Sequence, residues 1–224
     1  MQEVKKNQAS DLEEGLSSLY EVIYYSRTTD DSDTEGLAIA YKKDKFNLVN
    51  EGMFWLSETP LVQSKGWGAS YYRICVTAPL EDKETGVDFE VFDVHLDVNV
   101  QAAREGGIQL VLDTIEERGN TSVVCGDFNA MNTETCYEII ANKMTDAQSS
   151  AGGEYGITYN GYGSLAFSPF ISSVDFIFFE SDVFKVNYFD ILTDTEEVTK
   201  EDGTSATFYY SDHYAVLSNV YLYY

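Results

Sequence analysis

Short segments rich in β-branched and aromatic residues recur along the chain and predict a strand-rich protein. The segment Val87–Leu96 shows the pattern clearly, because alternate residues from Val87 to Val91 share one side of an extended chain. Asp93 and His95 continue on that same side, so polar groups are expected at the end of an apolar strand. The same composition predicts strands at Glu21–Arg27, Gly36–Lys42, Phe46–Leu56, Tyr71–Ala78, Thr121–Cys125, Ser173–Phe179, Val183–Leu192 and Tyr214–Leu222.

Helical periodicity is strongest over Asn99–Arg118. Ile108, Leu112 and Ile115 lie on one stripe of this segment, which predicts a helix with one buried face. Gly119 follows directly and supplies a stop signal.

Two shorter helices complete the expected pattern. One follows the S-x-x-E sequence from Ser10 to Glu13, a capping box, and the other covers Thr133–Ala141. Strands with helices interspersed favour two sheets packed face to face with helices outside, more than a doubly wound parallel sheet. No internal repeat or Pro/Ser-rich linker divides the chain, so residues 1–224 are expected to form one domain. The acidic segment Asp194–Asp202 is expected to be a solvated excursion between two strands.

The charge balance is strongly acidic. The 224 residues include 14 Lys and Arg against 38 Asp and Glu, a formal net charge of −24. This excess argues against a protein that wraps duplex DNA, since such binding depends on Lys and Arg at the phosphates. It is compatible with bound Mg²⁺ or Ca²⁺, which need carboxylates. No run of about 18 apolar residues is present, so no stable membrane insertion is expected.

Cysteine and histidine usage restricts the metal chemistry. Cys75, Cys125 and Cys136 cannot all pair within one chain and form no C-x-x-C, which argues against a disulfide scaffold or a zinc knuckle. With only His95 and His213, a multi-histidine metal site is excluded. Any catalytic chemistry is therefore expected to depend on carboxylates, amides and these two imidazoles.

The strongest local signal lies in Val123–Asn129, where a hydrophobic strand ends in Gly126 and then presents Asp127 and Asn129. Because these two residues are two positions apart, their side chains project to the same side of an extended segment. An acid and an amide would then lie close together, as in a functional site. A simple turn explains the pattern equally well, because Gly, Asp and Asn are common turn residues.

Both histidines lie beside aspartates at strand ends. His95 precedes Asp97 at the end of one strand, and His213 follows Asp212 at the start of the last strand. Asp175 lies in a run of hydrophobic residues, where its burial is costly unless a donor such as histidine is near. Each feature alone has a structural explanation, and only their conjunction predicts a site.

Taken in order along the chain, these segments resemble the endonuclease/exonuclease/phosphatase family, which includes pancreatic-type deoxyribonucleases, sphingomyelinases and inositol polyphosphate phosphatases. The matching motifs are Gln2-Glu3, Glu35 ahead of an Ile-x-Tyr strand, His95-Leu96-Asp97, Gly126-Asp127-Phe128-Asn129, Ser173–Phe179 and Ser211-Asp212-His213. Gly52–Pro60 and Ser64–Trp67 resemble the bacterial branch in particular. The resemblance implies a DNase I-like α/β fold, a four-layer α/β/β/α sandwich of two mixed, mainly antiparallel sheets.

The resemblance also implies a metal site and a water-activating acid. Glu3 is similar to the family's principal Mg²⁺ ligand, for which Mn²⁺ or Ca²⁺ are the expected substitutes, and Asp212 is similar to an acid near the metal. Asp127 resembles the acid that positions or deprotonates the attacking water. Asn129 resembles the amide that holds a phosphate oxygen.

The two imidazoles receive roles in the same way. His213 resembles the imidazole at the scissile phosphate, with Asp175 as its orienting partner. His95 matches a second phosphate-contacting histidine, steadied by Glu35. A carboxylate beside an imidazole fixes its tautomer and raises its basicity.

These features predict a metal-dependent hydrolase of phosphate esters, in which water positioned by Asp127 and His213 attacks phosphorus in line. Arg73 and Arg104 are candidate contacts to the substrate phosphate, with a surface salt bridge as an equal alternative for either. A chain of charge −24 repels polyanions, so a small phosphodiester, phosphomonoester or lipid headgroup is expected more than long nucleic acid. A monomer is expected, and nuclease, phosphatase and sphingomyelinase activities all stay open.

One departure from the family motivates a second hypothesis. In the family a first strand ending in a metal-contacting asparagine, and a helix, precede the Gln-Glu motif, whereas Met1 lies in the middle of the expected second strand. The chain is therefore expected to be truncated at its N-terminus relative to the family, which leaves the compartment open. The alternative function is a catalytically impaired remnant that keeps the sandwich for binding. A carbohydrate-binding β-sandwich is the third hypothesis, in which the histidine–aspartate pairs serve only packing.

Overall fold

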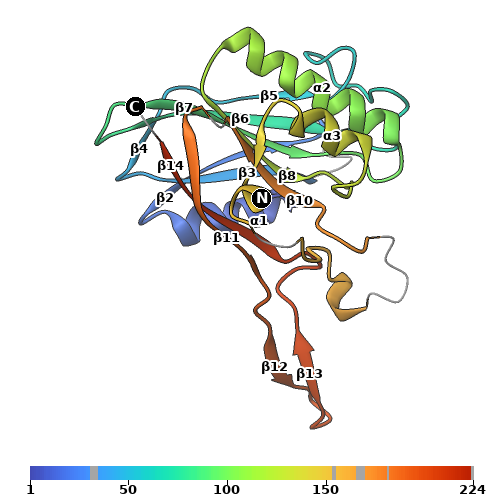
Figure 1. Cartoon of the computed structure of the whole chain (residues 1–224). Helices are drawn as coiled ribbons and strands as arrows, with labels where there is room; N and C mark the ends of the chain where they lie inside the picture. The colour runs from blue at the N-terminus through green and yellow to red at the C-terminus, as the bar shows by residue number, and fades with distance from the viewer. Residues whose placement is uncertain (31–34, 153–154, 165–169, 181, 223–224) are drawn as a thin grey trace.

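A mixed sheet of seven strands forms the centre of the computed structural model, which describes residues 1–30, 35–152, 155–164, 170–180 and 182–222 (Figure 1). The strand order is β4-β6-β7-β8-β10-β9, and β5 also pairs with β6. Among the described strands, β7 and β8 are the one parallel pair. The strands of this central sheet are β4 (Phe46–Leu48), β5 (Gly52–Trp55), β6 (Ile74–Asp82), β7 (Asp88–His95), β8 (Ser122–Asp127), β9 (Thr145–Asp146) and β10 (Asp175–Phe179).

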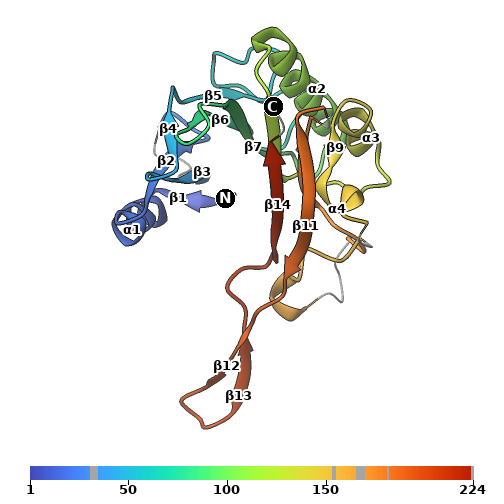
Figure 2. The same ribbon diagram turned by 60° about the vertical axis from the view of Figure 1, so that its left-hand side comes forward.

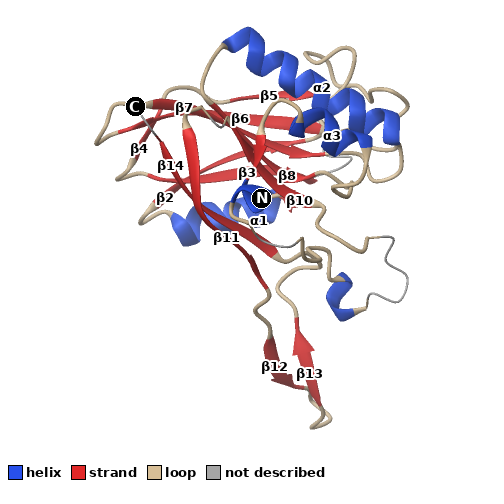
Figure 3. Cartoon of the chain, in the orientation of Figure 1, coloured by secondary structure: helices blue, strands red, loops and turns tan. Residues whose placement is uncertain are grey.

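Helices α2 (Gln101–Arg118) and α3 (Thr135–Ala141) cover one face of the central sheet (Figure 3). The predicted stripe of α2 faces inward, because Ile108, Leu112 and Ile115 all belong to the core between helices and sheet. Gly119 ends α2 in the left-handed conformation, with φ at +65°, as the stop signal predicted. The strands contribute Phe92, Val94, Val124, Phe176 and Phe178 to this core.

Two small sheets form a second layer on the opposite face of the central sheet. One has the order β1-β3-β2, and the other pairs β11 with β14. Phe89 of the central sheet packs against the apolar clusters beneath both, so the two small sheets share one layer. Helix α1 packs on the outside of the first through Ala9 and Leu12. These elements are β1 (Val4–Lys5), α1 (Lys6–Leu16), β2 (Tyr20–Ser26), β3 (Glu35–Lys42), β11 (Phe184–Leu192) and β14 (Ala215–Leu222).

The layers therefore follow the predicted order of helix, sheet, sheet, helix, and Figure 2 shows β1 and β14 on the same side of the central sheet. Within the described strands, β1 pairs with β3 and β14 with β11, and neither has a partner on its other edge. A cavity of about 420 Å³ lies between them, lined by Gln2 on one side and Ala215 on the other. No described helix has the length and apolar character that crossing a membrane requires.

A long hairpin projects away from the sandwich (Figures 1 and 2). It consists of β12 (Glu196–Thr199) and β13 (Ser205–Phe208), joined by a turn through Gly203 with φ at +83°. The acidic segment Asp194–Asp202 is solvated and lies between β11 and β14, as expected, but part of it forms β12. Short helices α4 (Ala147–Ser150) and η1 (Gly161–Gly163) flank the stretch before β10.

Three expected boundaries were wrong for identifiable reasons. The first helix begins at Lys6 and not after Ser10, because the Gln8 side chain accepts from the Lys5 backbone N–H and caps the helix earlier. The segment 46–56 is two strands, since the chain leaves the sheet between β4 and β5 and rejoins β6 at a different position. Strand β6 starts at Ile74, because Asp97 Oδ2 accepts from the backbone N–H groups of residues 70 and 71 and holds them in a loop.

The register of the central sheet places three polar residues in one row. His95 of β7 lies opposite Asp127 of β8, and Asp127 lies opposite Asp175 of β10. His95 has the parity of Phe89 and Val91, which pack toward the second layer, so the row faces the space between the two layers. Two neighbouring pairings of the central sheet thus bring together residues that are up to 80 positions apart in sequence.

Candidate active site

A cavity of about 490 Å³ opens where this row ends. Residues from both layers and from the loops around them line it, and eight of them were predicted as site residues. The predicted residues in its lining are Glu3, Glu35, Arg73, His95, Asp127, Asn129, Asp212 and His213. Segments that are far apart in sequence therefore meet at one cavity, as the motifs predicted.

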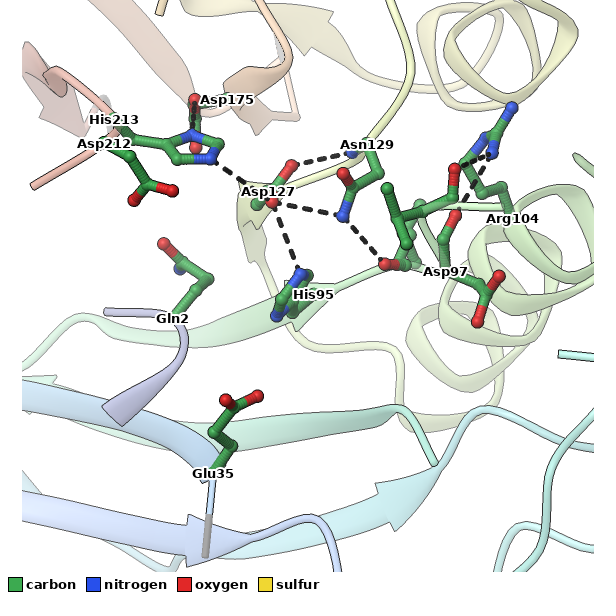
Figure 4. Close-up of polar contacts among 12 residues, drawn as sticks. Gln2, Glu35, His95, Asp97, Arg104, Asp127, Asn129, Asp175, Asp212 and His213 are labelled. Carbon is green, nitrogen blue, oxygen red and sulfur yellow. Dashed lines mark hydrogen bonds and ion pairs between the residues drawn. The ribbon is translucent and has the colours of Figure 1, made fainter. Parts of the chain in front are cut away.

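Asp127 lies at the centre of this cavity and is held by Asn129 (Figure 4). The Asn129 backbone N–H donates to Asp127 Oδ1 at 2.7 Å, and its side-chain Nδ2 donates to Oδ2 at 3.2 Å. Nδ2 also donates to the Leu96 carbonyl at 3.1 Å, so both amide hydrogens are used. Asn129 was predicted to hold a phosphate oxygen, whereas its amide hydrogens are engaged by Asp127 and the backbone.

His213 is oriented by Asp175. Its Nδ1 lies 2.8 Å from Asp175 Oδ2, and its Nε2 points to Asp127 with 4.0 Å to Oδ2. Burial alone lowers the pKa of His213, but the hydrogen bond and charge of Asp175, with Asp127 and Asp212, raise it to about 9. The imidazole is therefore protonated at neutral pH and carries a positive charge into the cavity.

A short segment after α4 fixes this pair in place. Tyr159 forms an isolated β-bridge with His213, and the backbone N–H of Asn160 donates to the Asp212 carbonyl at 2.7 Å. The Thr158 hydroxyl, fully buried, accepts from the backbone N–H of Asp175 at 3.2 Å. One segment thus contacts the backbone of both His213 and Asp175, which restrains the relative position of the two residues.

His95 is in the opposite electrostatic state. Its Nε2 lies 3.4 Å from Asp127 Oδ2, and burial together with the charges of Arg73 and Arg27 lowers its pKa well below the ordinary value. It was expected to be steadied by Glu35. The structure shows a contact with Asp127 instead, and Glu35 forms an ion pair with Arg27 at 2.8 Å.

Asp127 has a raised pKa. Burial is the main cause and the charge of Asp175 adds to it, against the opposing effects of His213 and the Asn129 N–H. A carboxylate whose pKa is raised is a stronger base once ionised, which suits it to accept a proton from water near neutral pH. Such shifts are typical of functional sites.

Three acidic residues crowd another part of the cavity. Burial and the charges of Glu35 and Asp212 raise the pKa of Glu3, so these carboxylates repel each other. Oxygen donors of this kind match Mg²⁺, which is usually held by one or two carboxylates, waters and substrate phosphate oxygens. Among the described residues, no three His, Cys, Asp or Glu side chains are arranged to hold an ion on their own. The oxygen donors of Glu3, Glu35 and Asp212 are of the kind that a hard cation takes together with waters and substrate oxygens.

Several cavity residues were missed by the sequence analysis. They are Arg27, Tyr71, Val98, Tyr159, Ser164 and Phe170. Tyr71 was placed in a strand, and its loop position depends on Asp97, 26 residues away. Arg27 had one usable signal, since it is one of only four arginines in an acidic chain and ends a predicted strand.

Arg104 lies outside the cavity (Figure 4). Its Nη1 donates to the carbonyls of Asp97 and Val98, and its Nη2 pairs with Glu134 at 2.8 Å. These bonds tie α2 to the loop before it and to Glu134. Arg104 thus forms a salt bridge, as in the alternative considered for it, but the pair is largely buried and not at the surface.

Sequence comparison alone finds little. No protein-family model matches the chain. An uncharacterized protein of Acanthamoeba polyphaga mimivirus is 29% identical over 119 residues, which is 50% of this chain and 44% of that protein. The chain therefore matches less than half the length of this relative.

Solved structures match nearly the whole chain. An endonuclease/exonuclease/phosphatase family protein from Bacteroides thetaiotaomicron is 32% identical with a TM-score of 0.86, covering 96% of this chain and 79% of that one. A mannosyl-6-phosphatase from the same organism is 32% identical with a TM-score of 0.87, covering 98% and 83%. The human Nocturnin catalytic domain, 17% identical with a TM-score of 0.70 over 99% and 79%, shares the fold.

Proposed function

The chain belongs to the endonuclease/exonuclease/phosphatase family, and on this premise we propose that it hydrolyses a phosphate ester in the cavity around Asp127. The observation that supports the proposal most directly is the row of His95, Asp127 and Asp175, completed by His213 at 2.8 Å from Asp175. A mannosyl-6-phosphatase among the similar structures supports action on a small phosphorylated molecule.

Asp127 and the two histidines each have a distinct role in this proposal. Asp127 orients the attacking water and accepts its proton, because its carboxylate is held by Asn129 and has a raised pKa. His213, protonated and held by Asp175, stabilises the negative charge that develops on the phosphoryl oxygens. His95 stays neutral and donates one hydrogen bond to the same group.

Glu3 and Asp212 are the residues that would hold a divalent cation, with Mg²⁺ as the proposed ion. When bound, such an ion supplies Lewis-acid stabilisation of the phosphoryl group. It also offsets the mutual repulsion of the carboxylates, which in a chain of charge −24 would otherwise keep an anionic substrate away.

Replacing Asp127 by Asn or His213 by Ala tests the proposal. Each change is expected to lower kcat about 10²–10⁴-fold, the usual range for a lost acid or base. The substrates are p-nitrophenyl phosphate and bis(p-nitrophenyl) phosphate, assayed with Mg²⁺ and with EDTA. Asp113→Asn is the matched control, because Asp113 is an exposed carboxylate on α2 outside the cavity lining.

Hydrolysis by the His213→Ala protein at the rate of the parent protein would refute the assignment. If the parent protein hydrolyses neither ester, nor DNA nor sphingomyelin, the result favours the alternative function, a binding protein that retains the fold.

A further inference from the structure

Two of the four arginines of this acidic chain meet at one wall of the cavity. Arg27 follows β2 and Arg73 precedes β6, so they come from different layers of the sandwich. Both guanidinium groups lie over the ring of Tyr71, with 5.5 Å from Arg27 Cζ and 5.4 Å from Arg73 Cζ to the ring centroid. All three side chains line the cavity that holds Asp127 and His95.

Arg73 is a buried arginine near the carboxylates of Asp127, Asp97 and Glu3, but none of them forms an ion pair with it in the described part of the chain. It is 6% exposed, its Nε is buried without a partner, and no described residue forms a hydrogen bond or ion pair with its guanidinium. Arg104 Nε is likewise buried without a partner, but Arg104 and Arg118 have carboxylate partners in Glu134 and Glu90. Burying an unpaired charge is unfavourable unless a ligand supplies the missing acceptors.

Arg27 is held in place by an ion pair with Glu35. Its Nη2 pairs with Glu35 Oε2 at 2.8 Å, and its side chain is 12% exposed. Burial and the positive charge of Arg27 lower the pKa of Arg73, so the two cations repel each other. An anion between them would relieve this repulsion, because a guanidinium has five donors in a planar fork that matches phosphate oxygens.

Tyr71, whose ring lies near both guanidinium groups, is held by a separate contact. Asp97, almost fully buried, accepts from the backbone N–H groups of Ser70 and Tyr71 at 2.9 and 3.1 Å. These bonds keep Tyr71 in the loop, where the residue is 45% exposed and lines the cavity. The ring faces attract both cations and so support their close approach.

We propose that Arg27, Tyr71 and Arg73 form a clamp that selects a dianionic terminal phosphate, which makes the preferred substrates phosphomonoesters and not phosphodiesters. The inference rests on the proposed function and adds its substrate class. A monoester presents three non-bridging oxygens and two negative charges, whereas a diester presents two such oxygens and one charge. Two guanidinium groups beside the histidines match the first pattern better than the second.

The experiment compares the parent protein with Arg27→Gln, Arg27→Lys and Arg73→Lys. The two nitrophenyl esters give kcat/KM with Mg²⁺, calorimetry gives the affinity for inorganic phosphate, and thermal melts check that each variant folds. Arg27→Gln is expected to lower kcat/KM for the monoester at least tenfold more than for the diester, and to weaken phosphate binding at least tenfold. The lysine variants are expected to retain only part of either property, because an ammonium lacks the planar fork with which a guanidinium binds two phosphate oxygens side by side.

Lys185→Gln is the control, since it removes one positive charge from an exposed position of β11. Equal losses on both esters, or phosphate affinity unchanged in Arg27→Gln, would overturn the clamp while leaving the proposed function intact. If the parent protein hydrolyses neither ester, nor DNA nor sphingomyelin, but binds phosphate in an Arg27-dependent way, the clamp stands and the proposed function fails.

Discussion

The two histidines of the cavity are held in opposite protonation states although both contact the same carboxylate. His95 Nε2 and His213 Nε2 lie 3.4 and 4.0 Å from Asp127 Oδ2. Burial and two nearby arginines lower the pKa of His95, whereas Asp175 raises that of His213 to about 9 despite burial. At neutral pH His95 is therefore neutral and His213 is charged. The first is suited to donate a hydrogen bond and the second to stabilise negative charge.

Replacing His95 by Asn is expected to change how stability depends on pH. The unfolded chain binds a proton at His95 as the pH falls below about 6.5, but the folded protein does not, so acid reduces the free energy of unfolding. The slope from this group is at most about 1.4 kcal/mol per pH unit. The asparagine variant lacks this loss, and urea unfolding between pH 5 and 8 in EDTA measures the difference.

His213→Asn is the matched control for this prediction. A histidine with a raised pKa contributes its stability fully below the unfolded pKa and loses it as the pH rises toward 9. The difference between the parent protein and this variant should therefore stay flat from pH 6 to 5. A flat difference for His95→Asn over the same range would contradict the prediction.

At the scale of elements, the parallel pairing of β7 and β8 aligns the site. Gly126 lies opposite Val94, and a Cβ built on it would come 1.9 Å from the Val94 carbonyl oxygen. Its φ of +139° is a conformation that side chains rarely adopt. The glycine thus allows the two strands to approach closely just before Asp127. This close approach fixes the position of the Asp127 carboxylate relative to His95.

Gly126→Ala is accordingly expected to destabilise the protein by at least about 3 kcal/mol, because the methyl group meets backbone and not a flexible side chain. Gly86→Ala is the matched control. Gly86 also has a positive φ, +70°, but nothing lies within 4 Å of its built Cβ, so a loss of only about 1–2 kcal/mol is expected. Chemical denaturation measures both, and equal losses would mean that backbone strain alone decides the effect.

At the scale of the whole molecule, the net charge of −24 and the acidic cavity act in the same direction. Both repel anions, and both disfavour the compact state through self-repulsion. The arginine pair on one wall of the cavity and a bound cation on the other would supply local positive charge, so that an anionic substrate can enter the cavity. The folded stability should therefore respond to cations in two separable ways.

Mg²⁺ is expected to raise the melting temperature more than NaCl does at equal ionic strength. Salt screens the overall repulsion, whereas Mg²⁺ also binds the folded state and adds about 1–3 kcal/mol at concentrations well above its Kd. Glu3→Gln should abolish the extra increase, and Glu117→Gln, which removes an exposed carboxylate of α2, should keep it. Identical melting curves in the two salts for the parent protein would contradict a divalent-cation site.

Much of the layer architecture was predictable from local pattern. The alternation in Val87–Leu96 placed His95 on the same face as the apolar residues from Val87 to Val91, and the structure shows that this face meets the second layer. The spacing of Ile108, Leu112 and Ile115 identified the buried face of α2. The polar strand ends at Asp127 and Asp175 stood out because their strands are otherwise apolar. Which residues share a face depends on the repeat of side-chain direction along a strand or a helix, and this repeat can be read directly from the sequence.

The tertiary structure alone decided which of these residues meet and in what electrostatic state. The row of His95, Asp127 and Asp175 depends on the registers of two strand pairs, and the loop position of Tyr71 depends on a hydrogen bond to Asp97. The pKa shifts and the arrangement of the arginine pair follow from burial and from neighbours far away in sequence. Sequence therefore determined the faces and the chemistry that each face carries, whereas long-range packing set the distances, because no local pattern specifies which strands become neighbours.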